Sequence, residues 1–441
     1  MRRCSLSVTR AAITLVLLAS ARALPAQPSP QPCDLLCLSG QAREALAAHK
    51  YDDYLRLARA VATRAPDHPG GHYAVARAFA LLGQSDSAFA ALERLLNLGA
   101  APDITADSVF APISTAPAFQ ALEAESERNA TPILRGQAAF SLPDADLVPE
   151  ALTWDPARRR WLIGSLAKRK VIAATDEGTS ADFISHPDLL RVVGIHADPV
   201  RELLWFATWE PTERIDPSGS GRITRTRLFK ADLATGRILG TYVPPDTAES
   251  QLLNDLAIAP NGDLYVTDTR AGQIYRLAAD GDSLEVFARP DPTRFSYANG
   301  IALADDDRAL YVAFIEGLAR IDPDTRRVVP LRAPTGVSTA QVDGLYWYRG
   351  DLIAVQNAPG LERVVRYDLN AAGDSIVAAE VLERSRDLLR VPTTGAIVGT
   401  RFYYIANSQA DRLDSDNHSS PATVSPAPLT VVRVIELDSQ E

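Results

Sequence analysis

Six copies of one short unit, spread over the chain after residue 134, constrain the fold more than any other feature. Each copy holds a small apolar strand, a turn that often carries Asp or Pro, and a second strand with an aromatic or Leu centre. The copies are spaced by 43, 61, 45, 44 and 51 residues. Repeats at this period, each long enough for four strands, are typical of a β-propeller. The first residues of the six copies, here called the ring residues, are Glu150, Val193, Asn254, Asn299, Asp343 and Thr394.

We therefore predict a mainly β protein with a six-bladed β-propeller over 134–441. The sixth unit shows two strands, a polar loop (408–428) and one more strand (429–437), which is one strand short of four. A strand at 134–142 precedes the first unit, and we expect it to complete the last blade and remove the open sheet edge. The long second interval holds a polar insertion, 210–224, which we expect to be a surface loop.

The segment 35–129 has a different texture, rich in Ala and Leu with helical spacing. Two stretches that begin at His49 and Gly83 align with an offset of 34 residues, a period typical of tetratricopeptide-like helical hairpins. Fewer than three such repeats are marginal alone, so we expect this small α domain to pack on the propeller. A groove that binds a protein partner is the functional alternative.

The first residues are typical of a secretory signal. Arg2 and Arg3 are followed by a short apolar run, 11–19, and by small residues suited to cleavage. We assign 1–26 to a signal peptide and 27–34 to a Pro-rich linker, and we expect a periplasmic or secreted protein without a membrane span. The formal net charge of -10 disfavours nucleic acid as a partner.

Two cysteines outside the signal, Cys33 and Cys37, are four residues apart. In an oxidising compartment they either form a disulfide or remain two small apolar residues. A regular helix would hold these positions in poor disulfide geometry, which favours the second alternative.

Equivalent positions in the innermost strands of a propeller converge on one axis. Here they bring together the carboxylates of Glu150 and Asp343 and the carboxamides of Asn254 and Asn299, with Asp255 beside them. Such hard oxygen ligands suit Ca²⁺ or another oxygen-preferring divalent cation. Without a cation the two carboxylates would repel, and one would tend to stay protonated.

The motifs PEALTWDP, LLNDLAIAPNGDLYVTD, SYANGIAL and QVDGLYW resemble those of the senescence-marker-protein/gluconolactonase/luciferin-regenerating-enzyme propellers, which are regucalcin-like; paraoxonases are more distant relatives. The resemblance covers about 134–437. It implies that Glu150, Asn299 and Asp343 bind the cation. It also implies that Asn254 contacts substrate or completes the metal shell.

Two positions depart from the families. The gluconolactonase members carry an Arg two residues before the Asn-Asp pair, where this chain has Leu252, and the paraoxonases carry a His where it has Val193. Neither sugar-lactone specificity nor a His-assisted mechanism is therefore favoured. His196 is interpreted as a structural histidine.

The expected function is a metal-dependent hydrolase of small lactones or esters. Asp343 is the candidate general base, Asn254 the candidate donor to the developing oxyanion, and Asp255 either contacts substrate or orients Asn254. The alternative is a non-catalytic propeller that binds a partner and holds a structural cation. A concave pocket beside the cation ligands would favour the enzyme, and a plugged mouth the scaffold.

Overall fold

The structure is a computed structural model that describes residues 33–215, 222–245, 250–413 and 429–438. The expected signal peptide and most of the Pro-rich linker lie outside the described residues. No helix within the described part of the chain is long and apolar enough to cross a membrane.

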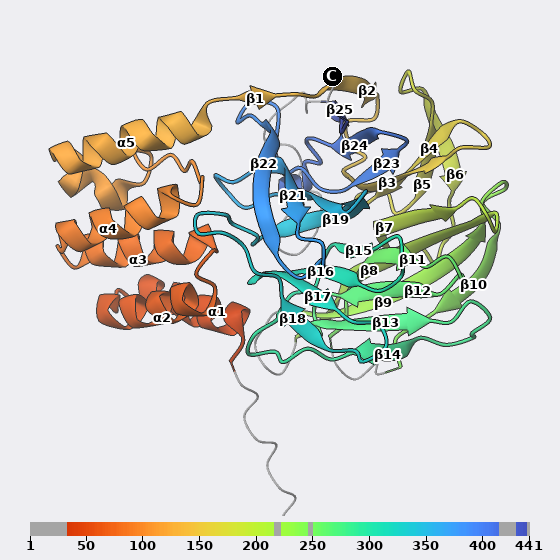
Figure 1. The fold of residues 1–441 in the computed structure, drawn as a ribbon, viewed down its shortest axis with the longest axis horizontal. Coiled ribbons are helices and arrows are strands. Elements are labelled where there is room, and N and C mark those ends of the chain that lie inside the picture. The colour runs from red at the N-terminus through yellow and green to blue at the C-terminus, as the bar shows by residue number, and fades with distance from the viewer. Residues whose placement is uncertain (1–32, 216–221, 246–249, 414–428, 439–441) are drawn as a thin grey trace, which may run out of the picture. The chain divides into compact units, whose positions relative to one another are not determined.

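Helices occupy the first part of the described chain (Figure 1). The starts of α2 and α4 are 34 residues apart, which is the offset seen in the sequence. Each helix buries an apolar face; α2, for example, buries Leu57 and Val61. The tetratricopeptide assignment itself stays a prediction. The elements are α1 (Leu35–Ala47), α2 (Tyr51–Arg64), α3 (Pro69–Leu81), α4 (Ser85–Leu96), the 3-10 helix η1 (Ser108–Ile113) and α5 (Pro117–Ala130).

Six antiparallel sheets form the blades, which confirms the six-bladed β-propeller. In blades 1 to 5 the chain runs through the sheet strand by strand. Blades 1 to 3 contain β3 (Pro149–Asp155), β4 (Arg160–Ser165), β5 (Val171–Ala174) and β6 (Ser180–Ile184); β7 (Arg191–Asp198), β8 (Leu203–Ile215), β9 (Arg222–Asp232) and β10 (Ile238–Tyr242); and β11 (Leu253–Ile258), β12 (Leu264–Asp268), β13 (Gln273–Leu277) and β14 (Glu285–Ala288).

The remaining blades follow the same plan, with a change in blades 5 and 6. Blade 5 gains a fifth, outer strand, and blade 6 takes a strand from before blade 1. They contain β15 (Ile301–Leu303), β16 (Leu310–Phe314), β17 (Gly317–Ile321) and β18 (Val328–Pro330); β19 (Val342–Tyr348), β20 (Asp351–Gln356), β21 (Arg363–Leu369), β22 (Ile376–Arg384) and β1 (Ile133–Leu134); and β23 (Gly395–Val398), β24 (Arg401–Ile405), β25 (Thr430–Glu436) and β2 (Gln137–Leu142).

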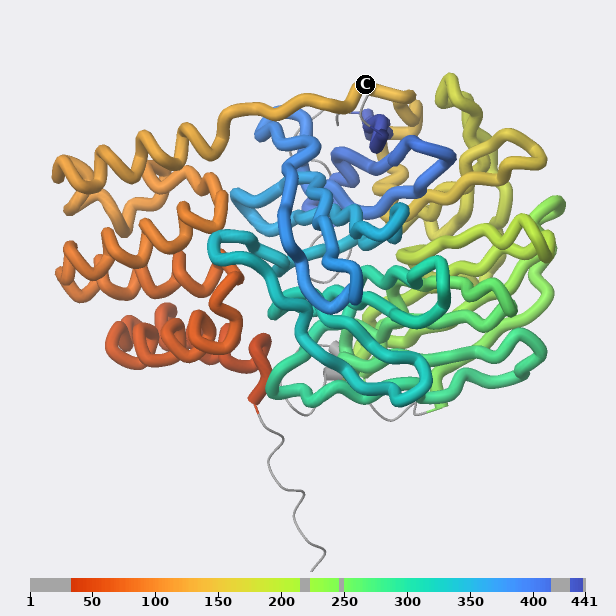
Figure 2. Tube along the Cα trace, in the orientation of Figure 1, coloured from red at the N-terminus to blue at the C-terminus, as the bar shows by residue number. Residues whose placement is uncertain are grey.

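The segment expected to close the ring does so, but as two strands rather than one. β2 pairs antiparallel with β25, while β1 pairs with β22 of the preceding blade. Figure 2 lets the reader follow the chain from β1 to β2 beside the C-terminal strand. Gly136 lies between them, where a Cβ atom would come within 2.3 Å of the Glu383 carboxylate. That carboxylate is buried and accepts hydrogen bonds from Arg433 and Tyr404.

The insertion 210–224 is not the surface loop that the sequence suggested. β8 continues to Ile215 and β9 begins at Arg222, so most of the insertion extends the blade 2 hairpin. Glu210 pairs with Arg225 in register, and their side chains form an ion pair. Cross-strand opposite charges of this kind stabilise polar strands, which explains why a polar composition was misread as a loop.

Cys33 and Cys37 form a disulfide, so the less favoured alternative holds. Cys33 precedes the helix, because Asp34 is the N-cap of α1 and accepts a hydrogen bond from the Cys37 N–H. The objection from helix geometry therefore does not apply. The carbonyl of Cys33 also accepts a hydrogen bond from Arg64, 2.9 Å away.

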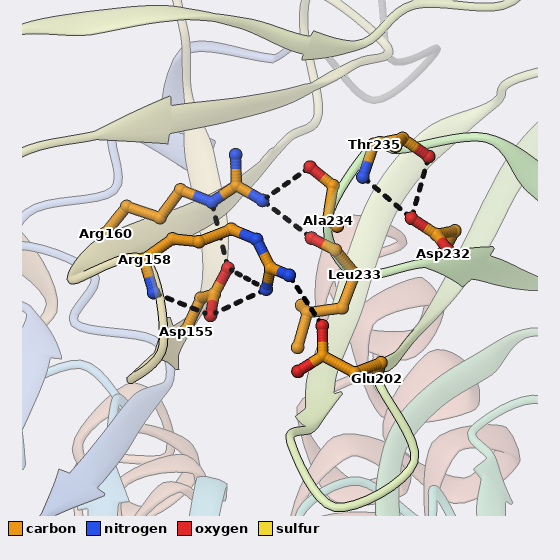
Figure 3. A network of polar contacts seen from close by, with 8 residues as sticks. All are labelled: Asp155, Arg158, Arg160, Glu202, Asp232, Leu233, Ala234 and Thr235. Atoms are coloured by element: carbon orange, nitrogen blue, oxygen red, sulfur yellow. Dashed lines mark hydrogen bonds and ion pairs between the residues drawn. The ribbon is translucent and has the colours of Figure 1, made fainter.

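A polar network joins blades 1 and 2 (Figure 3). Asp155 is fully buried and accepts hydrogen bonds from both Arg158 and Arg160. Arg158 reaches Glu202 of blade 2 at 2.6 Å, and Arg160 reaches the carbonyl of Leu233 at 2.6 Å. The arginines thus fix one blade against the next and compensate the charge of Asp155.

The helices contact the loops of blades 4 and 5. The apolar core of the helices includes Ala358 and Leu361, and a smaller cluster joins Ile315 to α1 and α2. Nε2 of His68 lies 2.7 Å from Nε2 of Gln341. These contacts fall beside the ring residues of the same two blades.

Candidate functional site

A β-bulge occurs near the first residue of the inner strand in four blades. The pairing register shifts between Pro149 and Ala151, Val192 and Gly194, Leu253 and Leu256, and Val342 and Leu345. A bulge bends the strand and re-aims the side chain of the extra residue. Bulged residues include the ring residues of all four strands: Glu150, Val193, Asn254 and Asp343.

Left-handed backbone marks three of the six blades at the same place. The residue two positions before the ring residue has φ of 44° at Val148, 60° at Tyr297 and 57° at Gln341. Positive φ in a bulky residue is costly and persists only where the surroundings impose it, often at functional sites. The three ring residues that follow are expected cation ligands, whereas the corresponding positions in blade 2 and before Asn254, the fourth expected ligand, have no such backbone.

Glycines next to the ring residues let the inner strands approach closely. A Cβ atom at Gly300 would lie 2.4 Å from the carbonyl oxygen of Asp343, and one at Gly194 would lie 2.0 Å from that of Asn254. Only glycine leaves room for neighbouring blades to meet at this distance. The glycines therefore allow the ring residues to converge.

The ring residues line a cavity of about 310 Å³. Five of the six contribute directly, and blade 6 contributes Thr393 instead of its ring residue. That ring residue, Thr394, uses its hydroxyl to donate a hydrogen bond to the Glu150 carbonyl at 2.8 Å. The full lining is Glu150, Leu166, Val193, Trp209, Leu252, Asn254, Tyr297, Asn299, Phe314, Ile315, Gln341, Val342, Asp343, Asn357, Val391, Thr393, Ala410 and Leu413.

Asp343 is held by two amides. Nδ2 of Asn299 donates to its Oδ1 at 2.8 Å, and Nδ2 of Asn357 donates to its Oδ2 at 2.7 Å. Burial raises the pKa of Asp343 to about 6, and the two amide hydrogen bonds oppose that rise. The carboxylate therefore has a fixed orientation and titrates close to neutral pH.

Glu150 lacks such support. Its Oε2 atom is buried and has no hydrogen-bond partner among the described residues. Burial, and next the charge of Asp343, raise the pKa of Glu150 well above its usual range. A buried carboxylate without a donor is costly, so this atom marks a place for a ligand.

Asn254 and Asp255 lie side by side but face different surroundings. Asn254 lines the cavity, and its Nδ2 donates to Thr269 Oγ1 at 2.9 Å. Asp255 and His196 are not among the lining residues. The Asp255 carboxylate accepts the N–H groups of Leu256 and Ile301, at 2.9 and 3.3 Å, and so links blade 3 to blade 4. Burial raises the pKa of Asp255 to about 7.

We tested whether these residues fit a divalent cation. The described residues contain no group of three or more His, Cys, Asp or Glu placed to hold a metal ion. Two carboxylates and the amides of Asn254, Asn299 and Asn357 do share the cavity. The unpartnered oxygen of Glu150 and the like charge of Asp343 fit an oxygen-preferring cation, provided that amide oxygens complete the donor set.

The sequence reasoning missed a second set of lining residues. These residues lie near the part of each blade's second strand that pairs with the beginning of its first strand. They are Leu166, Trp209, Ile315 and Asn357. Thr269, which holds Asn254, occupies the same place in blade 3. The signal was present, because the six repeats are in phase along both strands and only the first strand was considered.

No protein-family model and no curated protein matches the sequence. Among solved structures, the chain is similar to the PQQ-bound aldose sugar dehydrogenase of Streptomyces coelicolor (14% identity, 69% of this chain and 97% of that chain covered, TM-score 0.46). It is also similar to a gluconolactonase of Xanthomonas campestris (16%, 69% and 91%, TM-score 0.44) and to the calcium-binding regucalcin of Agrobacterium tumefaciens (18%, 67% and 93%, TM-score 0.42). These proteins differ in activity, and we draw no functional argument from the likeness.

Proposed function

We propose that this protein is a divalent-cation-dependent hydrolase of small lactones or esters, with Ca²⁺ the first candidate for the cation. One observation carries the proposal: Glu150 and Asp343 share a cavity, and one oxygen of Glu150 is buried without a partner. The left-handed residues before Glu150, Asn299 and Asp343 support it, because three blades adopt the same costly backbone at one place.

Glu150, Asn299, Asp343 and Asn254 would hold the cation. When bound, the cation supplies Lewis acidity to an ester carbonyl and to water. Asp343 accepts a proton at one of its Oδ atoms, since the two amides keep this carboxylate turned toward the cavity.

Asn254 provides a donor to the developing oxyanion. One of its two N–H groups is engaged by Thr269, which in turn donates to the Ala298 carbonyl at 2.7 Å. The hydrogen bond to Thr269 fixes the plane of the Asn254 amide. The second N–H lies in that plane, so its direction is fixed as well. A preorganised donor of this kind stabilises charge at little cost in reorganisation.

The cavity favours an enzyme over a scaffold with a structural cation. A purely structural ion needs no space beside its ligands, whereas here the carboxylates open into about 310 Å³. Residues 1–26 further support a periplasmic or secreted location as part of the proposal. A protein partner of the helices remains an additional proposal from the sequence.

The proposal is tested by hydrolysis assays on purified protein. We expect chelator-treated protein to be inactive on a panel of lactones and aryl esters, and Ca²⁺ or another divalent cation to restore activity. The Asp343→Ala variant should stay inactive when the cation is added back. Absence of cation-dependent hydrolysis across the panel, in protein shown to bind a cation by metal analysis, would leave the scaffold as the better account.

A further inference from the structure

Apolar residues from blades 1 to 3 and the loop after blade 6's second strand line part of the cavity; Leu166, Val193, Trp209, Leu252 and Leu413 are here called the apolar wall. Leu166 and Val193 belong to the propeller's own core, and Trp209 and Leu413 pack against the same cluster. The wall faces the cavity that holds Glu150 and Asp343. Apolar surface that lines a cavity gains free energy when an apolar ligand replaces water on it.

The backbone of Leu252, one of the wall residues, is held by hydrogen bonds at both its N–H and its carbonyl. Its N–H donates to Asp268 Oδ1 at 2.9 Å, and its carbonyl accepts from the Thr269 N–H at 2.8 Å. The side chain is only 8% exposed. Because both backbone groups are engaged, the wall is a preformed part of the site.

No Lys, Arg or His is found among the described residues that line the cavity. The only charged lining groups are the carboxylates of Glu150 and Asp343. An anionic substrate would meet no counter-charge from the protein, and the hydroxyls of a sugar lactone would lose their water partners against the wall. The part of a ligand that lies on the wall is therefore neither anionic nor hydroxylated.

The cavity also holds a second unpartnered polar atom. Thr393 is 1% exposed, and its Oγ1 has no hydrogen-bond partner among the described residues. Glu150 Oε2, which lines the same cavity, shares this property. A ligand that satisfies the site therefore has a compact polar group for Thr393 and an apolar part for the wall.

We infer that the substrate is an uncharged lactone or ester that carries an apolar chain, with the chain on the wall and an ester oxygen accepting the Thr393 hydroxyl. This inference rests on the proposed function and specifies its substrate class. Each methylene group buried on the wall should raise kcat/KM by about four-fold until the wall is covered.

The test is a series of γ-lactones with growing alkyl chains, from γ-valerolactone to γ-nonalactone, with D-glucono-δ-lactone as the polar comparison. Hydrolysis is followed by pH-stat. We expect kcat/KM to rise along the series and glucono-δ-lactone to be the poorest substrate. Val193→Thr, which changes little volume, should lower kcat/KM for γ-nonalactone by roughly 5-fold and leave γ-valerolactone less affected.

Val200→Thr is the matched control, because Val200 is 86% exposed and absent from the cavity. It should leave the series unchanged. Melting temperatures of both variants separate a folding defect from a binding defect. If Val193→Thr unfolds, Leu252→Met and Leu252→Gln give a second apolar-to-polar pair on the wall.

The outcomes separate the two proposals. Hydrolysis without chain-length dependence, or a preference for glucono-δ-lactone, overturns the inference and leaves the proposed function standing. If neither the lactones nor the aryl esters are hydrolysed, the proposed function fails, and calorimetry of γ-nonalactone binding decides the inference. If γ-nonalactone binds and Val193→Thr weakens that binding, the role of the apolar wall is supported. If γ-nonalactone does not bind, the inference is overturned.

Discussion

The two sides of the cavity are built from the same repeat yet differ in chemistry and support. In blades 4 and 5 the ring residues are Asn299 and Asp343, each preceded by a left-handed residue. In blades 2 and 3 the ring residues are Val193 and Asn254, both with ordinary backbone before them, and the apolar wall takes Val193 and Leu252 from these blades. The polar side is costly to build, and the apolar side is not.

The support differs in the same way. Helices contact the loops beside the polar ring residues, through His68 at Gln341 and through the shared core that includes Ala358. Four of the five wall residues pack in a cluster made of propeller residues alone, and this cluster also contains Val148, the left-handed residue before Glu150. The same repeat therefore places chemistry at one point with two kinds of support: the helices brace the strained positions of blades 4 and 5, and the propeller core braces that of blade 1.

The largest expected effect removes the charge from the polar side. Asp343→Asn keeps the size of the side chain and loses both the base and the negative charge, so kcat/KM should fall by about 100-fold or more. Asp306→Asn, in a turn where the Asp306 side chain is 59% exposed, is the matched control and should behave as the parent. Steady-state kinetics on one lactone checks both, and an active Asp343→Asn variant contradicts the assignment.

A second prediction concerns cation binding. At a Ca²⁺ concentration about 100 times the Kd, binding to the folded state should stabilise the protein by about 2.7 kcal/mol. Glu150→Gln should lose most of this gain, because the buried Oε2 atom is an acceptor without a partner and the proposed cation ligand. Thermal unfolding with and without Ca²⁺ measures this gain, and Glu285→Gln, at the exposed first position of β14, is the control. An undiminished shift in Glu150→Gln would place the cation elsewhere.

The close approach of blades 4 and 5 gives a third prediction. Gly300→Ala places a Cβ 2.4 Å from the Asp343 carbonyl oxygen, so the free energy of unfolding should fall by about 1–3 kcal/mol. Gly40→Ala is the opposite case, because its nearest neighbour is 3.9 Å away and Ala favours helix α1. Denaturant unfolding should show a loss for the first and a small gain for the second. Equal effects would mean that the strands can separate freely.

The smallest expected effect tests the bracing by the helices. Burial lowers the pKa of His68 to about 4, with a smaller contribution from the charge of His72. The unfolded chain takes up this proton near pH 6.5, so between these values it binds more protons than the folded protein, and stability falls as pH decreases. From about pH 7.5 to about pH 6 the loss should be about 0.8 kcal/mol.

His68→Gln should remove this part of the pH dependence of unfolding. His186→Gln is the control, since the side chain of His186 is 45% exposed. Chemical denaturation at the two pH values gives the comparison. If the parent and His68→Gln lose stability equally, His68 does not contribute through its protonation.

Much of the fold was predictable, because repeats report topology directly. The six copies gave the blade count, and equal phase brought Glu150, Asn299 and Asp343 to one cavity. The strand that completes blade 6 was predictable from an unfilled place in the last unit. These inferences need only periodicity and the rule that sheet edges are avoided.

What could not be predicted depends on local geometry. Positive φ at Val148 runs against the preference of a β-branched residue and is imposed by tertiary contacts. The extension of β8 depends on cross-strand charge pairs that a polar composition hides. Asn357 and Thr393 line the cavity, but neither is the first residue of a repeat, which was the position used for the prediction. The Cys33–Cys37 disulfide could not be predicted without knowing where α1 begins.

The pairing of β2 with β25 has a consequence for how the chain is made. Arg433 bonds to Gly136 across a separation of 297 residues, so blade 6 is incomplete until the chain has been made as far as β25. Until then β2 presents a free edge that another chain can pair with. A chain that stops before Thr430 should therefore be prone to aggregation although it contains most of the blades, and quality control of this protein should depend on β25.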